Sequence, residues 1–154
     1  MSISTIITTL EKLATLHDYL YELTVRKAEV VKSNSLEDLQ ELTQEEKKFT
    51  KAIYQLEQQR AALSDGKTVS ELAEEANAAE RESLLQLKDR LTGTIQSIQQ
   101  QNELNQQLLN QSLQFITVTL NTLTQEPSAV TYEKGANIKK NTTTPTRSMF
   151  DSKA

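Results

Sequence analysis

Residues 36–63 read LEDLQELTQEEKKFTKAIYQLEQQRAAL, and this stretch decides the fold. Its apolar side chains recur every three or four residues without a gap, which is the spacing of a coiled-coil seam. Only Glu46 and Arg60 interrupt the apolar character of the seam. The seam consists of Leu39, Leu42, Glu46, Phe49, Ile53, Leu56, Arg60 and Leu63. The sequence therefore predicts a helix over 36–63 that packs along one side against other helices.

The preceding residues predict a helix over 3–33. Its apolar side chains also recur every three or four residues, which places them on one face of a helix. Short polar side chains at Ser33, Asn34 and Ser35 compete with the backbone for hydrogen bonds and predict the end of this helix. The hydroxyl of Ser35 can also accept a hydrogen bond from the first-turn amides of the next helix.

A third helical segment is expected over 69–123. Residues 64–67 predict the turn before it, because Gly66 can adopt the left-handed conformation that ends a helix. Thr68 and Glu71 have the spacing of a capping box and predict its start. Gly93 is the weakest point of this segment, because glycine lowers helix propensity by about 1 kcal/mol. Two alternatives are open there: the helix continues through Gly93, or it breaks.

The predicted fold class is all-α. We expect an antiparallel helical bundle or coiled coil of three main helices over residues 1–123, with a long third helix. Residues 124–154 contain both prolines and few apolar side chains, a composition that predicts a flexible, disordered tail. Isolated apolar side chains in such a tail are typical of short binding motifs. The expected anchors in the tail are Tyr132, Ile138, Met149 and Phe150.

Composition excludes several kinds of chemistry. The chain has no cysteine, one histidine and three widely separated glycines, so thiolate sites, histidine-rich metal centres and glycine-rich phosphate loops are not expected. We expect no cofactor and no metal. The net charge of −4 argues against nucleic-acid binding. The sequence also lacks a membrane-spanning run and the pattern of a secretion signal, and we expect a cytoplasmic protein without membrane insertion.

The sequence does not predict an enzyme. His17 and Asp18 are neighbours, but adjacent positions on a helix point about 100° apart and cannot form an oriented pair. The paired glutamates Glu45-Glu46 and Glu74-Glu75 have no histidine at a spacing that would complete a metal site, and we interpret them as solvated charge.

The most unusual feature is a stretch rich in glutamine and asparagine over 96–114. The seam that passes Leu91 continues into this stretch and there acquires amide side chains. Two interpretations are open: an ordinary glutamine-rich helix exposed on most sides, or a docking face that another helix completes. The residues of the docking face would be Asn102, Asn105, Leu108, Leu109, Ser112, Phe115, Ile116 and Leu120.

A second copy of the chain could also cover the apolar positions of this face, including Leu123. The alternative function is therefore a structural coiled-coil protein in which the apolar residues mediate homodimerisation.

The order of features along the chain resembles the FlgN-type flagellar export chaperones. The resemblance rests on Leu56-Glu-Gln-Gln-Arg60, on the stretch 102–111 followed by Phe115, and on a basic tail. In that tail, Glu126-Pro127 is followed by Tyr132 and Gly135, and the sequence ends in Phe150-Asp-Ser-Lys-Ala154.

This resemblance implies a cytosolic chaperone without ATPase activity. Its partners would be the flagellar hook-filament junction proteins, whose C-terminal amphipathic helix it binds and shields from premature assembly. It would then deliver them to the cytoplasmic domain of the type III export gate. The resemblance places the substrate-binding face on the late third helix and the neighbouring tail, and it assigns the contact with the gate to Tyr132. The alternative for Tyr132 is that it folds back onto the bundle.

Overall fold

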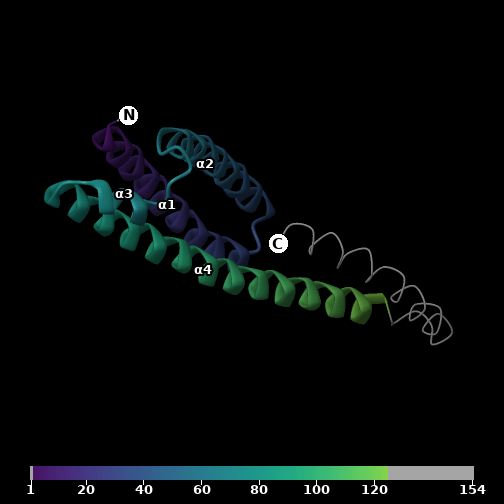
Figure 1. The fold of residues 1–154 in the computed structure, drawn as a ribbon. Helices are drawn as coiled ribbons and strands as arrows, with labels where there is room; N and C mark the ends of the chain where they lie inside the picture. The colour runs from purple at the N-terminus through teal and green to yellow at the C-terminus, as the bar shows by residue number, and fades with distance from the viewer. Residues whose placement is uncertain (1, 125–154) are drawn as a thin grey trace. The chain divides into compact units, whose positions relative to one another are not determined.

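The computed structural model describes residues 2–124 and confirms the all-α fold class. Its described residues form four helices: α1 (Ile3–Ser33), α2 (Leu36–Leu63), α3 (Val69–Glu75) and α4 (Ala78–Thr124) (Figure 1). The chain divides at Ser112 into unit 1, Met1–Ser112, and unit 2, Leu113–Ala154, of which residues 113–124 are described. The predicted division into a bundle of 1–123 and a tail of 124–154 stays a prediction.

Local hydrogen bonds set the ends of α1 and α2. Asn34 adopts a left-handed conformation with φ of 57° and closes α1. The Ser35 hydroxyl accepts a hydrogen bond from the Asp38 amide, as its position predicted. At the other end of α2, Gly66 has φ of 78°, and its amide donates to the Ala61 carbonyl at 3.1 Å.

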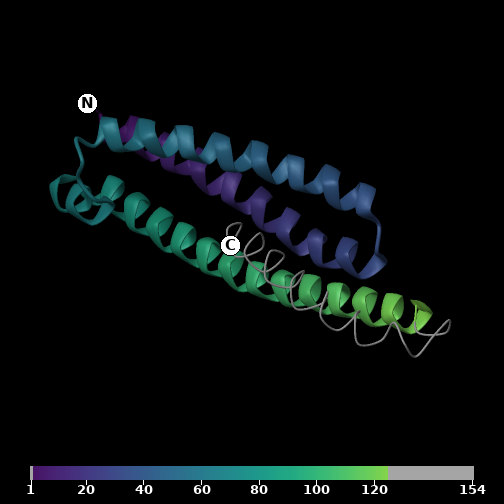
Figure 2. The same ribbon diagram turned by 90° about the vertical axis from the view of Figure 1, so that its right-hand side faces the viewer.

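Helices α1 and α2 are antiparallel neighbours and lie side by side in both ribbon views (Figures 1 and 2). Lys27 of α1 pairs with Glu46 of α2, with 3.5 Å between Nζ and Oε2. Further along, the rings of Tyr19 and Phe49 lie 5.9 Å apart. All eight seam positions predicted in α2 are buried or half-buried, so this helix does present that side to the bundle.

The first part of α4 runs parallel to α1. Arg90 of α4 forms an ion pair with Asp18 of α1, and Asn105 of α4 bonds to Thr24 of α1, so residue numbers rise together along both helices. Within unit 1, α1, α2 and residues 78–112 of α4 therefore follow an up-down-up order.

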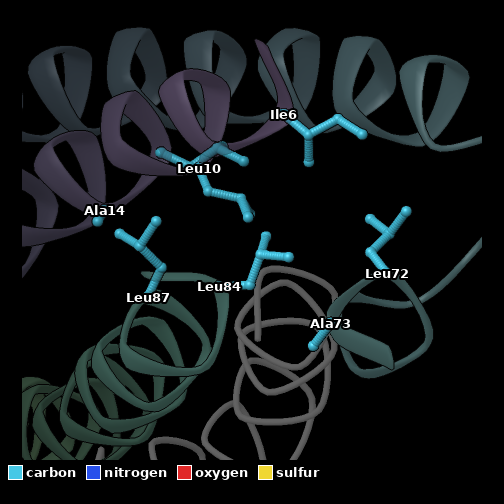
Figure 3. Close-up of a cluster of buried hydrophobic side chains, with 8 residues drawn as sticks. Ile6, Leu10, Ala14, Leu72, Ala73, Leu84 and Leu87 are labelled. Atoms are coloured by element: carbon cyan, nitrogen blue, oxygen red, sulfur yellow. The ribbon is translucent and has the colours of Figure 1, made fainter. Parts of the chain in front are cut away.

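The core of unit 1 lies where the starts of α1 and α4 meet α3 (Figure 3). Leu84 is fully buried there, and Leu87 faces Ala14. Apolar burial of this kind is the main source of folding free energy. The buried cluster consists of Ile6, Leu10, Leu13, Ala14, Leu72, Ala73, Leu84 and Leu87.

The expectation of one helix over 69–123 was wrong in one respect, since α3 ends at Glu75 and α4 starts at Ala78. Ala76 is extended, with ψ of 161°. The Asn77 side chain accepts a hydrogen bond from the Glu80 amide at 2.9 Å, so it caps a new helix. The Thr68 side chain caps α3 as predicted by accepting a hydrogen bond from the Glu71 amide.

The break does not fall at Gly93, where α4 is continuous. On either side of this glycine, Arg90 and Thr94 both bond to the carboxylate of Asp18 on α1. Leu91 packs against the core. These tertiary contacts offset the intrinsic cost of a glycine in a helix, which is about 1 kcal/mol.

Candidate docking surface on α4

Within unit 1, one side of α4 faces the bundle and is buried. Leu84, Leu87 and Ile98 are at most 9% exposed. Asn105 continues this side and is only 2% exposed. Its Nδ2 donates to the Thr24 carbonyl at 2.7 Å, and its Oδ1 accepts from Gln101 at 3.1 Å. The amide that the seam spacing placed in the interior is therefore satisfied within unit 1.

This burial corrects the placement of Asn105 on a docking face. A side chain that bonds to the α1 backbone and is excluded from solvent has no surface to offer a partner. Among the other predicted residues of unit 1, Asn102 is exposed, while Leu108, Leu109 and Ser112 are half-buried.

The described part of unit 2 is different, because none of residues 113–124 is buried. Ile116 is 49% exposed and Leu120 is 56% exposed, as the predicted docking face requires. Leu113 and Leu123 share their side of the helix, since the four positions are separated by three, four and three residues. We call Leu113, Ile116, Leu120 and Leu123 the exposed strip.

Phe115 is also exposed, at 70%, but it does not belong to the exposed strip. It follows Leu113 by two positions and precedes Ile116 by one, so helical geometry directs it to another side. Val118, three positions on, shares that side and is 62% exposed. The prediction missed Val118; the available signal was its three-residue spacing from Phe115.

Charge is absent from this end of α4. From Leu104 to Thr124 the sequence contains no Asp, Glu, Lys or Arg. Coiled-coil partners are normally selected by charges beside the seam, so a partner of this surface would have to be selected by apolar spacing and shape. It offers no acid, base or nucleophile other than hydroxyl and amide groups.

The groups considered above for catalysis have structural roles. His17 is half-buried, and its Nδ1 donates to the Leu13 carbonyl of its own helix at 2.7 Å. Asp18 bonds to Arg90 and Thr94, which joins α1 to α4. Residues 2–124 contain no group of three or more His, Cys, Asp or Glu side chains placed to hold a metal ion.

The remaining predicted site residues lie outside the described residues. They are Tyr132, assigned to the export gate, and the tail anchors Ile138, Met149 and Phe150.

Comparison with known proteins identifies the family. The sequence matches the family described as FlgN protein over residues 1–140. The chain belongs to the FlgN family. This confirms the resemblance found in the sequence, and it makes the general role that of a flagellar export chaperone. FlgN proteins are a family of chaperones rather than enzymes.

This FlgN-family chain is also similar to a protein of Bacillus subtilis. The chain is 29% identical to the uncharacterized protein YvyG of Bacillus subtilis (strain 168), and the match covers the whole of both chains. No solved structure matches the chain. Across the described helices of this FlgN-family member, none combines the length and the apolar character needed to cross a membrane.

Proposed function

We propose that this FlgN-family chain binds the C-terminal amphipathic helix of flagellar hook-filament junction proteins through the exposed strip. The binding shields that helix from premature assembly, and the chaperone then delivers its client to the cytoplasmic domain of the export gate. Family membership supports the general role, and the exposed strip supports a helical client. The site of action in this proposal is the cytoplasm.

The observation that carries the proposal is that the large apolar side chains of the exposed strip are accessible to solvent. The four residues of the exposed strip are 36% to 68% exposed and recur every three or four positions. An amphipathic helix presents its apolar side chains at the same spacing, so its ridge fits along such a row. Covering the row removes apolar surface from water on both partners, at roughly 25 cal/mol per Å².

The absence of charge in residues 113–124 also suits a chaperone that must release its client. No buried ion pair has to be broken when the client leaves, and no fixed charge sets its orientation. The contact relies on apolar burial, whose strength increases with the length of the row that is covered.

The test is a titration of the full chain with a peptide of the C-terminal helix of a junction protein. Ile116→Asp with Leu120→Asp should weaken binding at least about 100-fold, because two charges would be buried in an apolar contact. Since both side chains are exposed, the free energy of unfolding should change by less than about 1 kcal/mol. Fluorescence anisotropy and urea denaturation measure the two effects.

The matched control is Gln114→Asp with Thr122→Asp, which adds the same charge to exposed positions on another side of the same helix. This variant should bind the peptide nearly as well as the unmodified chain. A chain that does not bind the peptide at about 50 μM would contradict the proposal. Equal losses in the two variants would also contradict it, since the effect would then come from charge alone.

A second copy of the chain is the competing occupant of the exposed strip. An uncharged row offers no repulsion to a copy of itself, so homodimerisation is physically possible. Sedimentation distinguishes the two: a dimer that the Ile116→Asp, Leu120→Asp variant converts to monomer, together with no peptide binding, would favour the structural coiled-coil alternative.

For delivery, the proposal assigns Tyr132 to the export gate. Tyrosine is frequent at interaction hot spots because it buries a ring and donates a hydroxyl. Tyr132→Ala should weaken binding of the purified gate domain by about 10-fold or more, with no effect on peptide binding. Calorimetric titration measures both, and unchanged gate affinity would remove Tyr132 from the proposal.

A further inference from the structure

The segment that carries the exposed strip has little intrinsic tendency to be a helix. β-branched residues lose side-chain freedom against the preceding helical turn, and threonine is among the weaker helix formers. Half of the positions between Leu113 and Thr124 are β-branched. They are Ile116, Thr117, Val118, Thr119, Thr122 and Thr124.

Hydrogen bonds within this segment add little stability. The Thr117 and Thr119 hydroxyls donate to the carbonyls four residues earlier, at 2.9 Å and 2.8 Å. Thr122 and Thr124 do the same at 2.9 Å each. Such bonds take up carbonyls that already accept backbone amides, and they slightly destabilise a helix.

Charge does not compensate for the low propensity. Residues 113–124 contain no charged side chain, so no ion pair spans a helical turn and no basic residue lies in the last turn of α4. Tertiary packing supplies most of the stability of protein helices. No residue of this segment is buried, and of its twelve positions only Asn121 is even half-buried.

We propose that residues 113–124 are helical for only part of the time in the free chain, and that the client helix holds them in the helical state. This inference rests on the proposed function and states how client binding is regulated, namely by the helical fraction of residues 113–124. Residues before Leu113 supply the helical start, so the segment only has to extend the helix, one residue at a time. The apparent affinity for the client is then the intrinsic affinity multiplied by the helical fraction.

The partner in this proposal is an amphipathic helix, because such a helix supplies the apolar tertiary contacts that residues 113–124 lack. An apolar row laid along Leu113, Ile116, Leu120 and Leu123 buries side chains that are adjacent only when the segment is helical. Client binding and helix formation therefore stabilise each other, and fraying of the segment opens a route for release.

Two pairs of substitutions test this coupling at Thr117 and Thr119. Both residues are exposed and lie at the two edges of the exposed strip, without belonging to it. Thr117→Ala with Thr119→Ala raises helix propensity, so peptide affinity should increase by about fivefold. Thr117→Gly with Thr119→Gly removes the same side-chain groups but lowers propensity, and affinity should fall by about threefold. If the threonine side chains themselves contacted the client, both pairs would weaken binding, and that result would overturn the inference.

The matched control uses the exposed Thr8 and Thr15 of α1, whose hydroxyls make the same bonds four residues back. Thr8→Ala with Thr15→Ala should leave peptide affinity unchanged. A gain equal to that of the Thr117, Thr119 alanine pair would contradict coupling at the segment.

Amide hydrogen exchange on the full chain supplies a readout that does not need the peptide. In the free chain, the amides of 117–124 should exchange at least about 100-fold faster than those of the buried stretch around Leu84, and the alanine pair should slow them. Peptide binding should slow them further. Protection in the free chain equal to that around Leu84 would overturn the inference.

The binding measurements separate the two proposals. Binding with equal affinity in all variants would overturn only the inference. No binding in any variant would reject the proposed function and, with it, the coupling to a client.

Discussion

Two regions of α4 repeat the same apolar spacing with opposite results. In unit 1, Leu84 and Leu87 are 0% and 8% exposed and pack into the core. In unit 2, Ile116 and Leu120 are 49% and 56% exposed. Spacing alone therefore establishes that a helix has an apolar side, and a neighbouring helix determines whether that side is buried. In a family of export chaperones, the uncovered row is the natural candidate for the client.

The largest difference between the two regions should appear on truncation of a leucine. Leu84→Ala removes a fully buried side chain and should lower the free energy of unfolding by about 2–5 kcal/mol. Leu120→Ala, at an exposed position of the same helix, should change it by less than about 0.5 kcal/mol. Urea denaturation followed by circular dichroism measures both. Similar losses in the two variants would show that Leu120 is covered in solution.

The amide side chains should show a smaller contrast. Asn105→Ala leaves the buried Thr24 carbonyl without its side-chain donor and should cost about 1–3 kcal/mol. Asn102→Ala at an exposed position three residues earlier should cost less than about 0.5 kcal/mol. The same denaturation experiment compares them. A negligible effect at Asn105 would contradict the conclusion that its hydrogen bond stabilises the packing of α4 against α1.

The smallest effect is expected at the ion pair between α1 and α4. The Asp18 and Arg90 side chains are 44% and 48% exposed, so water screens their attraction. A double-mutant cycle with Asp18→Asn and Arg90→Gln should give a coupling free energy of about 0.2–1 kcal/mol. The coupling should decrease at high salt. A value well above this range would place the pair among the main stabilising contacts of unit 1.

Much of the fold was predictable because local rules set it. The bounds of α1 and α2 follow from Asn34, Ser35 and Gly66, whose side chains or backbone freedom end or start helices. The break at Asn77 was also readable in principle, since Asn77 and Glu80 have the spacing of a capping box. It was missed because the apolar side chains continue on both sides of it.

The candidate docking surface was predictable only in part. The exposure of Phe115, Ile116 and Leu120 agrees with the prediction, and the sequence also showed that this end of the helix lacks charge. The hydrogen-bond partner of Asn105 could not be inferred, because an amide in a seam can bond to its own chain or to another protein with equal chemistry. The choice depends on the Thr24 carbonyl, which is 81 positions away in sequence.

The sequence by itself determined that the chain is helical, where α1 and α2 begin and end, and that α4 carries an apolar row without charges near its end. These properties depend on contacts within a few residues, so local patterns encode them. Only the tertiary structure decided which parts of that row are buried. Burial depends on residues of α1 that are distant in sequence, and no local pattern specifies where such a neighbour is present.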